Sequence, residues 1–144
     1  MLRWWRSMPV LAVAGAAAIA GCGGDYPKKA DEICKKSAER VHRLTEAKGA
    51  GDLPAYFRAA QVILSDQIRE LKAIKPPDKK KPAYERFIAG LEQTLTELRR
   101  ASDTVATNPN RALAQITRQR AEKSGVRSQE ATVAGLKECA KTAA

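Results

Sequence analysis

Residues 52–77, DLPAYFRAAQVILSDQIRELKAIKPP, contain the strongest helical pattern in the chain. Asp52 is a favourable N-cap, and Pro54 is tolerated in the first turn of a helix. Apolar residues then recur at the three- and four-residue spacing of one helical face. Pro76-Pro77 ends the pattern, because a residue before proline is pushed out of the helical region. The stripe consists of Leu53, Phe57, Ala60, Leu64, Ile68, Leu71 and Ile74, flanked by Tyr56 and Ile63.

Helices are also expected on both sides of this stretch. A first helix is predicted from about Lys28 to Lys48, and a third from Pro82 to about Val105. Asn108-Pro109 is typical of an N-cap followed by a first-turn proline, which predicts a fourth helix from Asn110 to about Ala134. The connection before this fourth helix is so short that the third and fourth helices should form an antiparallel hairpin.

The fourth helix has the weakest pattern. Gly135 is expected to end it, with Leu136 folding back and Cys139 lying just beyond. Small residues on its inner face would allow close packing against bulkier neighbours. That expected face comprises Leu113, Ile116, Ala121, Ser124, Ser128 and Ala131.

The N-terminal residues have the three parts of a secretory signal. Arg3 and Arg6 are positive, Val10–Ala20 is apolar and uncharged, and small residues precede Cys22. A retained membrane-spanning helix is the alternative. Cleavage is favoured, because the uncharged run over residues 7–24 is at the short limit for spanning a bilayer.

The end of this leader, Ile19-Ala20-Gly21-Cys22, resembles the lipobox of bacterial lipoproteins. The resemblance implies that Cys22 receives a diacylglyceryl thioether, with acyl chains such as palmitate, and becomes the first mature residue. Two acyl chains suffice for stable attachment. The expected organisation is a signal peptide over 1–21, a tether over 22–29 and a helical domain over 30–144, lipid-anchored at the extracytoplasmic face of the cell membrane. An ordinary secretory signal with a chance cysteine is the alternative.

Lipid on Cys22 would leave one pair of cysteines, Cys34 and Cys139. Such a pair is expected to oxidise outside the cytoplasm. Four helices predict an all-α, up-down-up-down four-helix bundle, in which the start of the first helix and the end of the fourth lie at the same end. The two cysteines occupy those positions, so a disulfide is expected to close the bundle.

A second resemblance covers most of the chain after the leader. The segments that carry it are Ala30-Asp31-Glu32-Ile33-Cys34-Lys35, the Leu71–Pro77 turn followed by Tyr84, and Gly135-Leu136-Lys137-Glu138-Cys139. These segments are similar to small helical envelope proteins of high-GC Gram-positive bacteria. No activity is implied by this resemblance. It supports the helical fold alone.

The sequence does not favour an enzyme. His42 is the only histidine, and no strained nucleophile turn accompanies it. Glu39 and His42 have the Glu-x-x-His spacing of di-iron bundles, but a second such motif is missing, so a pair on the surface is the simpler interpretation. We therefore expect no catalytic residue, no metal site and no cofactor.

Basic residues suggest a partner. Only Arg3 and Arg6 of the 26 basic residues lie in the leader, which has none of the 16 acidic residues, so the net charge falls from +10 to +8 on cleavage. Anionic lipids or cell-wall polymers are candidate partners, and an ordinary solvated surface is the alternative. Nucleic acid is not expected, since no aromatic residues interleave the charges. The candidate contacts are Lys75, Lys79, Lys80 and Lys81, with a second basic set on the fourth helix at Arg111, Arg118, Arg120, Lys123 and Arg127.

The expected function is a non-enzymatic binding or structural module of the cell envelope, anchored by lipid. A protein partner is not identifiable from the sequence. The alternative is a carrier that holds a small ligand or a metal in the core of the bundle. A preformed pocket lined by Tyr56, Phe57, Tyr84 and Phe87 would favour the carrier.

Overall fold

A computed structural model describes residues 24–48 and 52–143, and that part of the chain is entirely helical. The all-α class predicted from the sequence is confirmed. Within the described ranges there are five helices. They are α1 (Tyr26–Lys48), α2 (Leu53–Lys72), α3 (Lys81–Val105), α4 (Pro109–Val133) and α5 (Lys137–Ala143).

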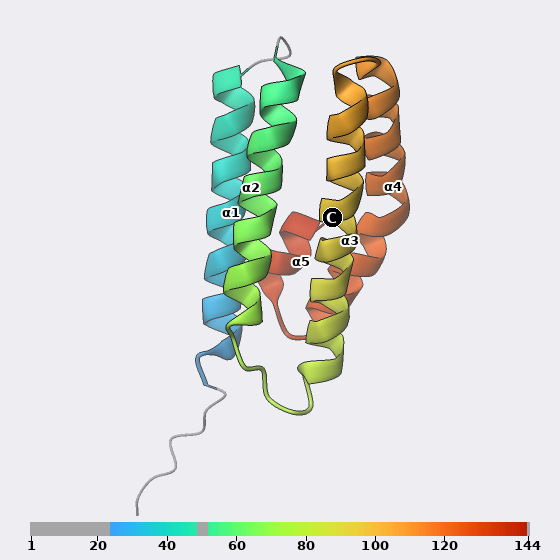
Figure 1. Ribbon diagram of the computed structural model, residues 1–144. Coiled ribbons are helices and arrows are strands. Elements are labelled where there is room, and N and C mark those ends of the chain that lie inside the picture. Colours follow the sequence, from blue (N-terminus) through green and yellow to red (C-terminus); the bar gives the residue numbers. More distant parts are fainter. Residues whose placement is uncertain (1–23, 49–51, 144) are drawn as a thin grey trace, which may run out of the picture.

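The four long helices form two hairpins, α1 with α2 and α3 with α4 (Figure 1). The α2–α3 loop lies at the same end of the molecule as the start of α1. Helix α5 then runs back between the hairpins and contacts both α1 and α4. Helix α5 was not predicted from the sequence. Only a folded-back leucine and a cysteine were expected after α4, because seven residues are too few to show a helical period.

Most helix boundaries follow from local chemistry. The side chain of Asp52 accepts a hydrogen bond from the backbone N–H of Ala55 at 3.0 Å, and Asn108 does the same for Arg111 at 3.0 Å. Both predicted N-caps are therefore confirmed. Helix α1 begins at Tyr26, two residues before its expected start, and α2 ends at Lys72, before the Pro76-Pro77 pair that was expected to end it. Residues 26–29, expected in the tether, thus form the first turn of α1.

A glycine turn produces the reversal after α4. Gly135 has a φ of 85°, which favours glycine. The N–H of Leu136 donates to the carbonyl of Ala131 at 2.9 Å, and the N–H of Gly135 donates to Thr132 at 2.9 Å. These two bonds form a Schellman motif. Leu136 is 1% exposed, so the turn also places a large apolar side chain in the core.

The buried apolar residues form two separate groups. The bridge core surrounds the two cysteines where α1, α3, α4 and α5 meet the end of α2, and the distal core lies at the opposite end of the bundle. The bridge core consists of Tyr26, Ala30, Cys34, Ile68, Leu71, Ala83, Tyr84, Phe87, Ile88, Leu91, Leu95, Ala131, Ala134, Leu136, Cys139 and Ala143, and the distal core of Phe57, Ala101, Val105 and Ala112.

The inner face predicted for α4 is wrong in part. Leu113 is 42% exposed, and Ala121 is also exposed, whereas Ala112 is fully buried in the distal core. Ala131 is buried as expected. Because alanine presents little bulk, α4 can pack closely on α3, and a short side chain rather than Leu113 takes the contact position.

Candidate binding cleft

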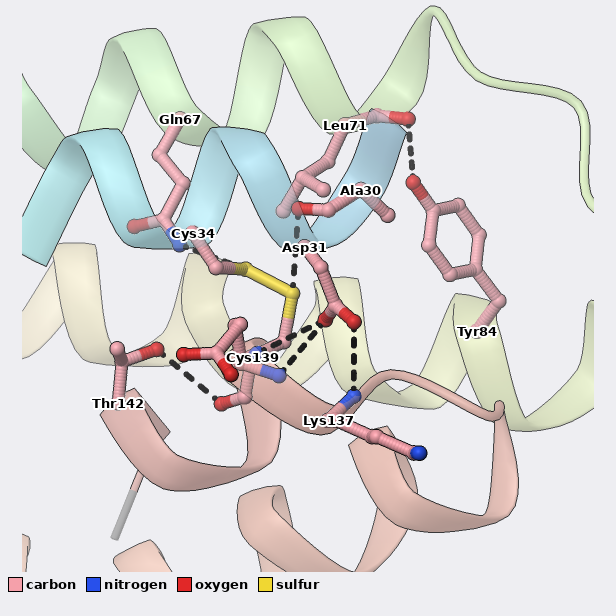
Figure 2. Close-up of a disulfide and its surroundings, with 10 residues drawn as sticks. Ala30, Asp31, Cys34, Gln67, Leu71, Tyr84, Lys137, Cys139 and Thr142 are labelled. Carbon is pink, nitrogen blue, oxygen red and sulfur yellow. Dashed lines mark hydrogen bonds between the residues drawn. A yellow bond between two sulfur atoms is a disulfide. The ribbon is translucent and has the colours of Figure 1, made fainter. Parts of the chain in front are cut away.

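A disulfide joins Cys34 of α1 to Cys139 of α5, as the sequence predicted (Figure 2). The two Cα atoms are 5.1 Å apart, and both residues are fully buried. The side-chain amide of Gln67 donates to the sulfur of Cys34 at 3.4 Å, so α2 also touches the bridge. The disulfide therefore fixes α5 against the hairpin of α1 and α2.

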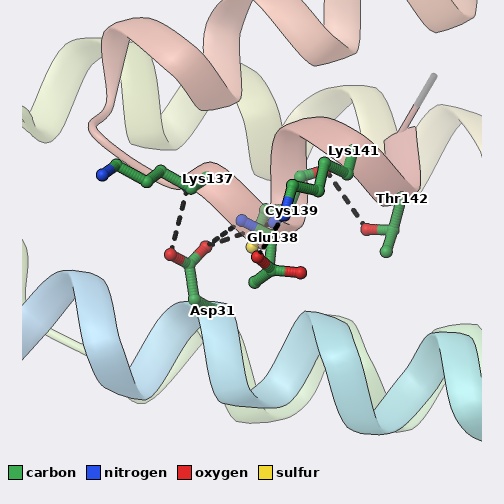
Figure 3. Close-up of polar contacts among 6 residues, drawn as sticks. All are labelled: Asp31, Lys137, Glu138, Cys139, Lys141 and Thr142. Carbon is green, nitrogen blue, oxygen red and sulfur yellow. Dashed lines mark hydrogen bonds and ion pairs between the residues drawn. The ribbon is translucent and has the colours of Figure 1, made fainter.

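The carboxylate of Asp31 provides a second link between α1 and α5 (Figure 3). It accepts hydrogen bonds from the backbone N–H groups of Lys137, Glu138 and Cys139, at 3.1, 2.9 and 3.2 Å. An acidic side chain is favourable at a helix N-terminus, where N–H groups lack partners within the helix. Asp31 thus stabilises the start of a helix more than one hundred residues away.

Two buried tyrosines complete this end of the molecule. The hydroxyl of Tyr26 donates to the carbonyl of Ala134 at 3.0 Å, and that of Tyr84 donates to Leu71 at 2.8 Å. Burial, with a smaller effect of the Asp31 charge, raises the pKa of Tyr26 to about 12. Burial and then the neighbouring Tyr26 also raise the pKa of Tyr84. Both side chains are therefore neutral hydrogen-bond donors at ordinary pH.

A cleft of about 470 Å³ lies between the two hairpins, and all five helices contribute to its lining. That volume is within the range of small-molecule sites, which are mostly apolar with a few polar groups. Residues near the end of α5, including Ala143, help to line it. The remaining lining residues are Ser37, Ala38, Val41, His42, Ala60, Ile63, Leu64, Gln67, Phe87, Leu91, Thr94, Leu98, Arg120, Arg127, Lys141 and Thr142.

The charges at this cleft are all of one sign. Arg120, Arg127 and Lys141 line it, and its described lining contains no aspartate or glutamate. Lys141 pairs with Glu138 at 2.6 Å, and this bond raises the pKa of the lysine. Burial, followed by the repulsion from Arg120, lowers the pKa of Arg127. The cleft therefore combines apolar walls with cationic groups.

The aromatic residues proposed for a carrier pocket do not meet in one place. Phe87 lines the cleft, but Phe57 belongs to the distal core, with Tyr56 packed against it at a ring separation of 6.1 Å. Tyr84 lies in the bridge core. The pocket that would have favoured the alternative function is therefore absent as specified, and the cleft has a different lining. The spacing of Arg120 and Arg127, two helical turns apart, is the sequence signal that would have placed both on one face.

No group of three or more histidine, cysteine, aspartate or glutamate side chains suited to a metal occurs in the described ranges. Glu39 and His42 are both exposed on α1. His42 lies at the edge of the cleft, and Glu39 is not part of the lining.

The four candidate lysines are exposed at or near the α2–α3 loop. Lys80 donates to the carbonyl of Val133 at 2.9 Å and so satisfies the last turn of α4. Lys81 lies 3.9 Å from the carboxylate of Glu85. Lys75 and Lys79 extend from the loop itself. Cys22, the predicted lipidation site, lies outside the described residues.

No family model, curated protein or solved structure matches this chain. Among the described helices, none combines the length and apolar character required to cross a bilayer.

Proposed function

We propose that this chain is an extracytoplasmic lipoprotein that binds a small ligand, without catalysis, in the cleft between its two hairpins. The cleft is the observation that supports the proposal. It has the size and mainly apolar lining of a ligand site, and a disulfide and a capped helix hold one of its walls in place. The structure thus favours the carrier over a purely structural module.

The anchor is the second part of the proposal. Ile19-Ala20-Gly21-Cys22 would place acyl chains on a cysteine only four residues before α1. We further propose that the long helices work as an up-down-up-down four-helix bundle standing on the membrane. The α2–α3 loop would then face the lipid, since it lies at the end where α1 begins (Figure 1). Lys75 and Lys79 are the residues best placed to approach anionic headgroups or wall polymers.

The binding site is tested with a neutral apolar fluorophore, N-phenyl-1-naphthylamine, on a chain starting at residue 23. All described helices, both cores and the disulfide lie within this chain. We expect saturable fluorescence enhancement. Ala60→Trp should abolish it by filling the cleft, whereas Val62→Trp, at a 57% exposed position of the same helix, should leave it unchanged. Equal binding to both variants, or none to the parent chain, contradicts the proposal.

The anchor is tested separately by Cys22→Ser in the full chain. The variant should be released from membranes or remain as the uncleaved precursor. Mass spectrometry of the parent protein should find an acylated N-terminal cysteine at residue 22. A mature N-terminus elsewhere, without acyl groups, would refute this part of the proposal and leave the ligand site unaffected.

A further inference from the structure

Among the residues that the structure describes, neither arginine of the cleft has an acidic partner. Neither Arg120 nor Arg127 makes an ion pair or a side-chain hydrogen bond to a carboxylate in the described structure, although eight other basic side chains of the described residues do. Arg127 is half-buried, and its electrostatic neighbour is Arg120. A desolvated cation beside a second cation is unfavourable unless an anion joins them.

The position of Arg127 is supported by a glycine on the facing helix. A Cβ atom added to Gly90 of α3 would lie 3.0 Å from Cγ of Arg127 and 3.4 Å from its Cδ. The aliphatic stem of the arginine therefore occupies the space that a side chain at residue 90 would take. Glycine is disfavoured in the interior of a helix, yet Gly90 is near the middle of α3. Its small size lets Arg127 lie directly on the helix surface.

The rest of the cleft offers a surface for hydrocarbon. Ile63 and Leu64 of α2 and Leu91 of α3 line it, with Ala38 and Val41 of α1. Besides the two arginines, the polar lining consists of His42, of Lys141, which is paired with Glu138, and of uncharged hydroxyl or amide side chains such as Ser37, Gln67 and Thr94. One part of the ligand must therefore be apolar, and another part must carry negative charge.

We propose that the ligand is a single-chain anionic amphiphile, a long-chain carboxylate, whose headgroup binds Arg120 and Arg127 while its hydrocarbon chain lies along the apolar walls. Guanidinium groups form paired hydrogen bonds with a carboxylate, which suits them to this headgroup. A volume of about 470 Å³ is in the lower part of the range for ligand sites, so one chain is expected rather than the two of a phospholipid. This inference rests on the proposed function, because it identifies the ligand class of the same cleft.

The probe is dodecanoate, measured by calorimetry below its micellar concentration with the chain starting at residue 23. Dodecyltrimethylammonium has the same hydrocarbon chain and the opposite charge, and it should bind at least about tenfold more weakly. Dodecyl phosphate distinguishes a carboxylate preference from a general anion preference. Binding of dodecanoate should weaken as salt is added.

The headgroup site is tested by the double variant Arg120→Gln/Arg127→Gln. Dodecanoate affinity should fall roughly tenfold or more, since charge-assisted hydrogen bonds are lost. Arg118→Gln is the matched control, because Arg118 is an exposed residue of the same helix outside the cleft. It should bind dodecanoate as the parent chain does. Thermal melting verifies that all variants are folded.

Gly90→Ala provides a test that removes no charge. Alanine is the better helix former, so α3 should not be weakened, but the new methyl group displaces the stem of Arg127. Dodecanoate affinity should fall, with N-phenyl-1-naphthylamine binding retained.

Two outcomes separate this inference from the proposed function. If the neutral fluorophore binds but dodecanoate and dodecyltrimethylammonium bind equally, or the double arginine variant behaves like Arg118→Gln, the anionic ligand is wrong and the cleft remains a binding site. If dodecyl phosphate binds tighter than dodecanoate, the carboxylate assignment is wrong. Failure of the neutral fluorophore to bind overturns both proposals.

Discussion

The two ends of this bundle are built very differently. The bridge end has a disulfide, a carboxylate that caps α5, two buried tyrosine hydroxyls with partners and the larger core. The distal end has a small core of four buried residues and no fifth helix. The cleft opens between them. The cleft leaves apolar surface uncovered, and the disulfide and the capped helix at the bridge end stabilise the fold beside it.

Removing the disulfide should reduce the difference in stability between the bridge end and the distal end more than the other changes described below. We expect Cys34→Ala/Cys139→Ala to lower the free energy of unfolding by about 4 kcal/mol, because the bridge closes a loop of 105 residues in the unfolded chain. Urea unfolding of this variant, and of the parent chain with and without reductant, provides the measurement. Hydrogen exchange should show that the bridge end loses more protection than the distal end. Equal losses at both ends would show that the two halves unfold as one unit.

A pair of leucines compares the two cores directly. Leu136 is 1% exposed in the bridge core, whereas Leu98 is half-buried beside the cleft and the distal core. Leu136→Ala should cost about 2–5 kcal/mol, the range for a buried leucine. Leu98→Ala should cost less, since its surroundings are already open on one side. Denaturant titration of both variants is the measurement, and a larger cost at Leu98 would reverse the comparison.

Alkaline pH should weaken the bridge end selectively. The folded-state pKa of Tyr26 is about 12, against an ordinary value of 10.0, so this side chain binds its proton more tightly when folded. The contribution of protonated Tyr26 to the free energy of unfolding is complete below pH 10. It is lost as the pH rises from 10 to 12, by on the order of 2–3 kcal/mol. Tyr26→Phe should reduce the slope of stability against pH in this window. Part of the slope should remain in the Tyr26→Phe variant, because burial raises the pKa of Tyr84 as well.

The smallest change in stability is expected when the Asp31 cap at the start of α5 is removed. Asp31→Ala removes the acceptor for three N–H groups of α5 and should cost about 1–2 kcal/mol. Glu32→Ala, at the next and exposed position of α1, is the matched control and should change stability little. Thermal unfolding distinguishes the two. A similar cost for both variants would mean that the capping bonds do not contribute measurably.

Local patterns predicted most of the helices and the covalent link. The capping residues Asp52 and Asn108 and the prolines after α2 are local signals. The pairing of Cys34 with Cys139 followed from the even number of cysteines left once Cys22 is set aside. The structure confirms the two caps and the disulfide, whereas α2 ends at Lys72, before the prolines. Helix α5 was missed because seven residues show no period, and the role of Asp31 was missed because its partners lie more than one hundred residues away.

The cleft was only partly predictable. A ligand in the core of the bundle was only the alternative function, with four aromatic residues as its expected lining, and the basic residues of α4 were assigned to an anionic partner. Phe57, Tyr84 and Phe87 are buried in the two cores, and of these only Phe87 also lines the cleft, since large apolar side chains gain most from complete burial. Which surfaces stay uncovered depends on how the hairpins and α5 pack, and no spacing in the sequence specifies that.

The bridge also determines how the molecule carries mechanical load. A pull between the N-terminal end of α1 and the end of α5 passes through the bond between Cys34 and Cys139, not through the hairpins. The 105 residues of sequence separation between them, roughly 350 Å of extended chain, remain inaccessible to that force while the bond is oxidised. Stretched between these two ends, the oxidised protein should therefore lengthen only slightly, and reduction should release the long extension in single-molecule force measurements.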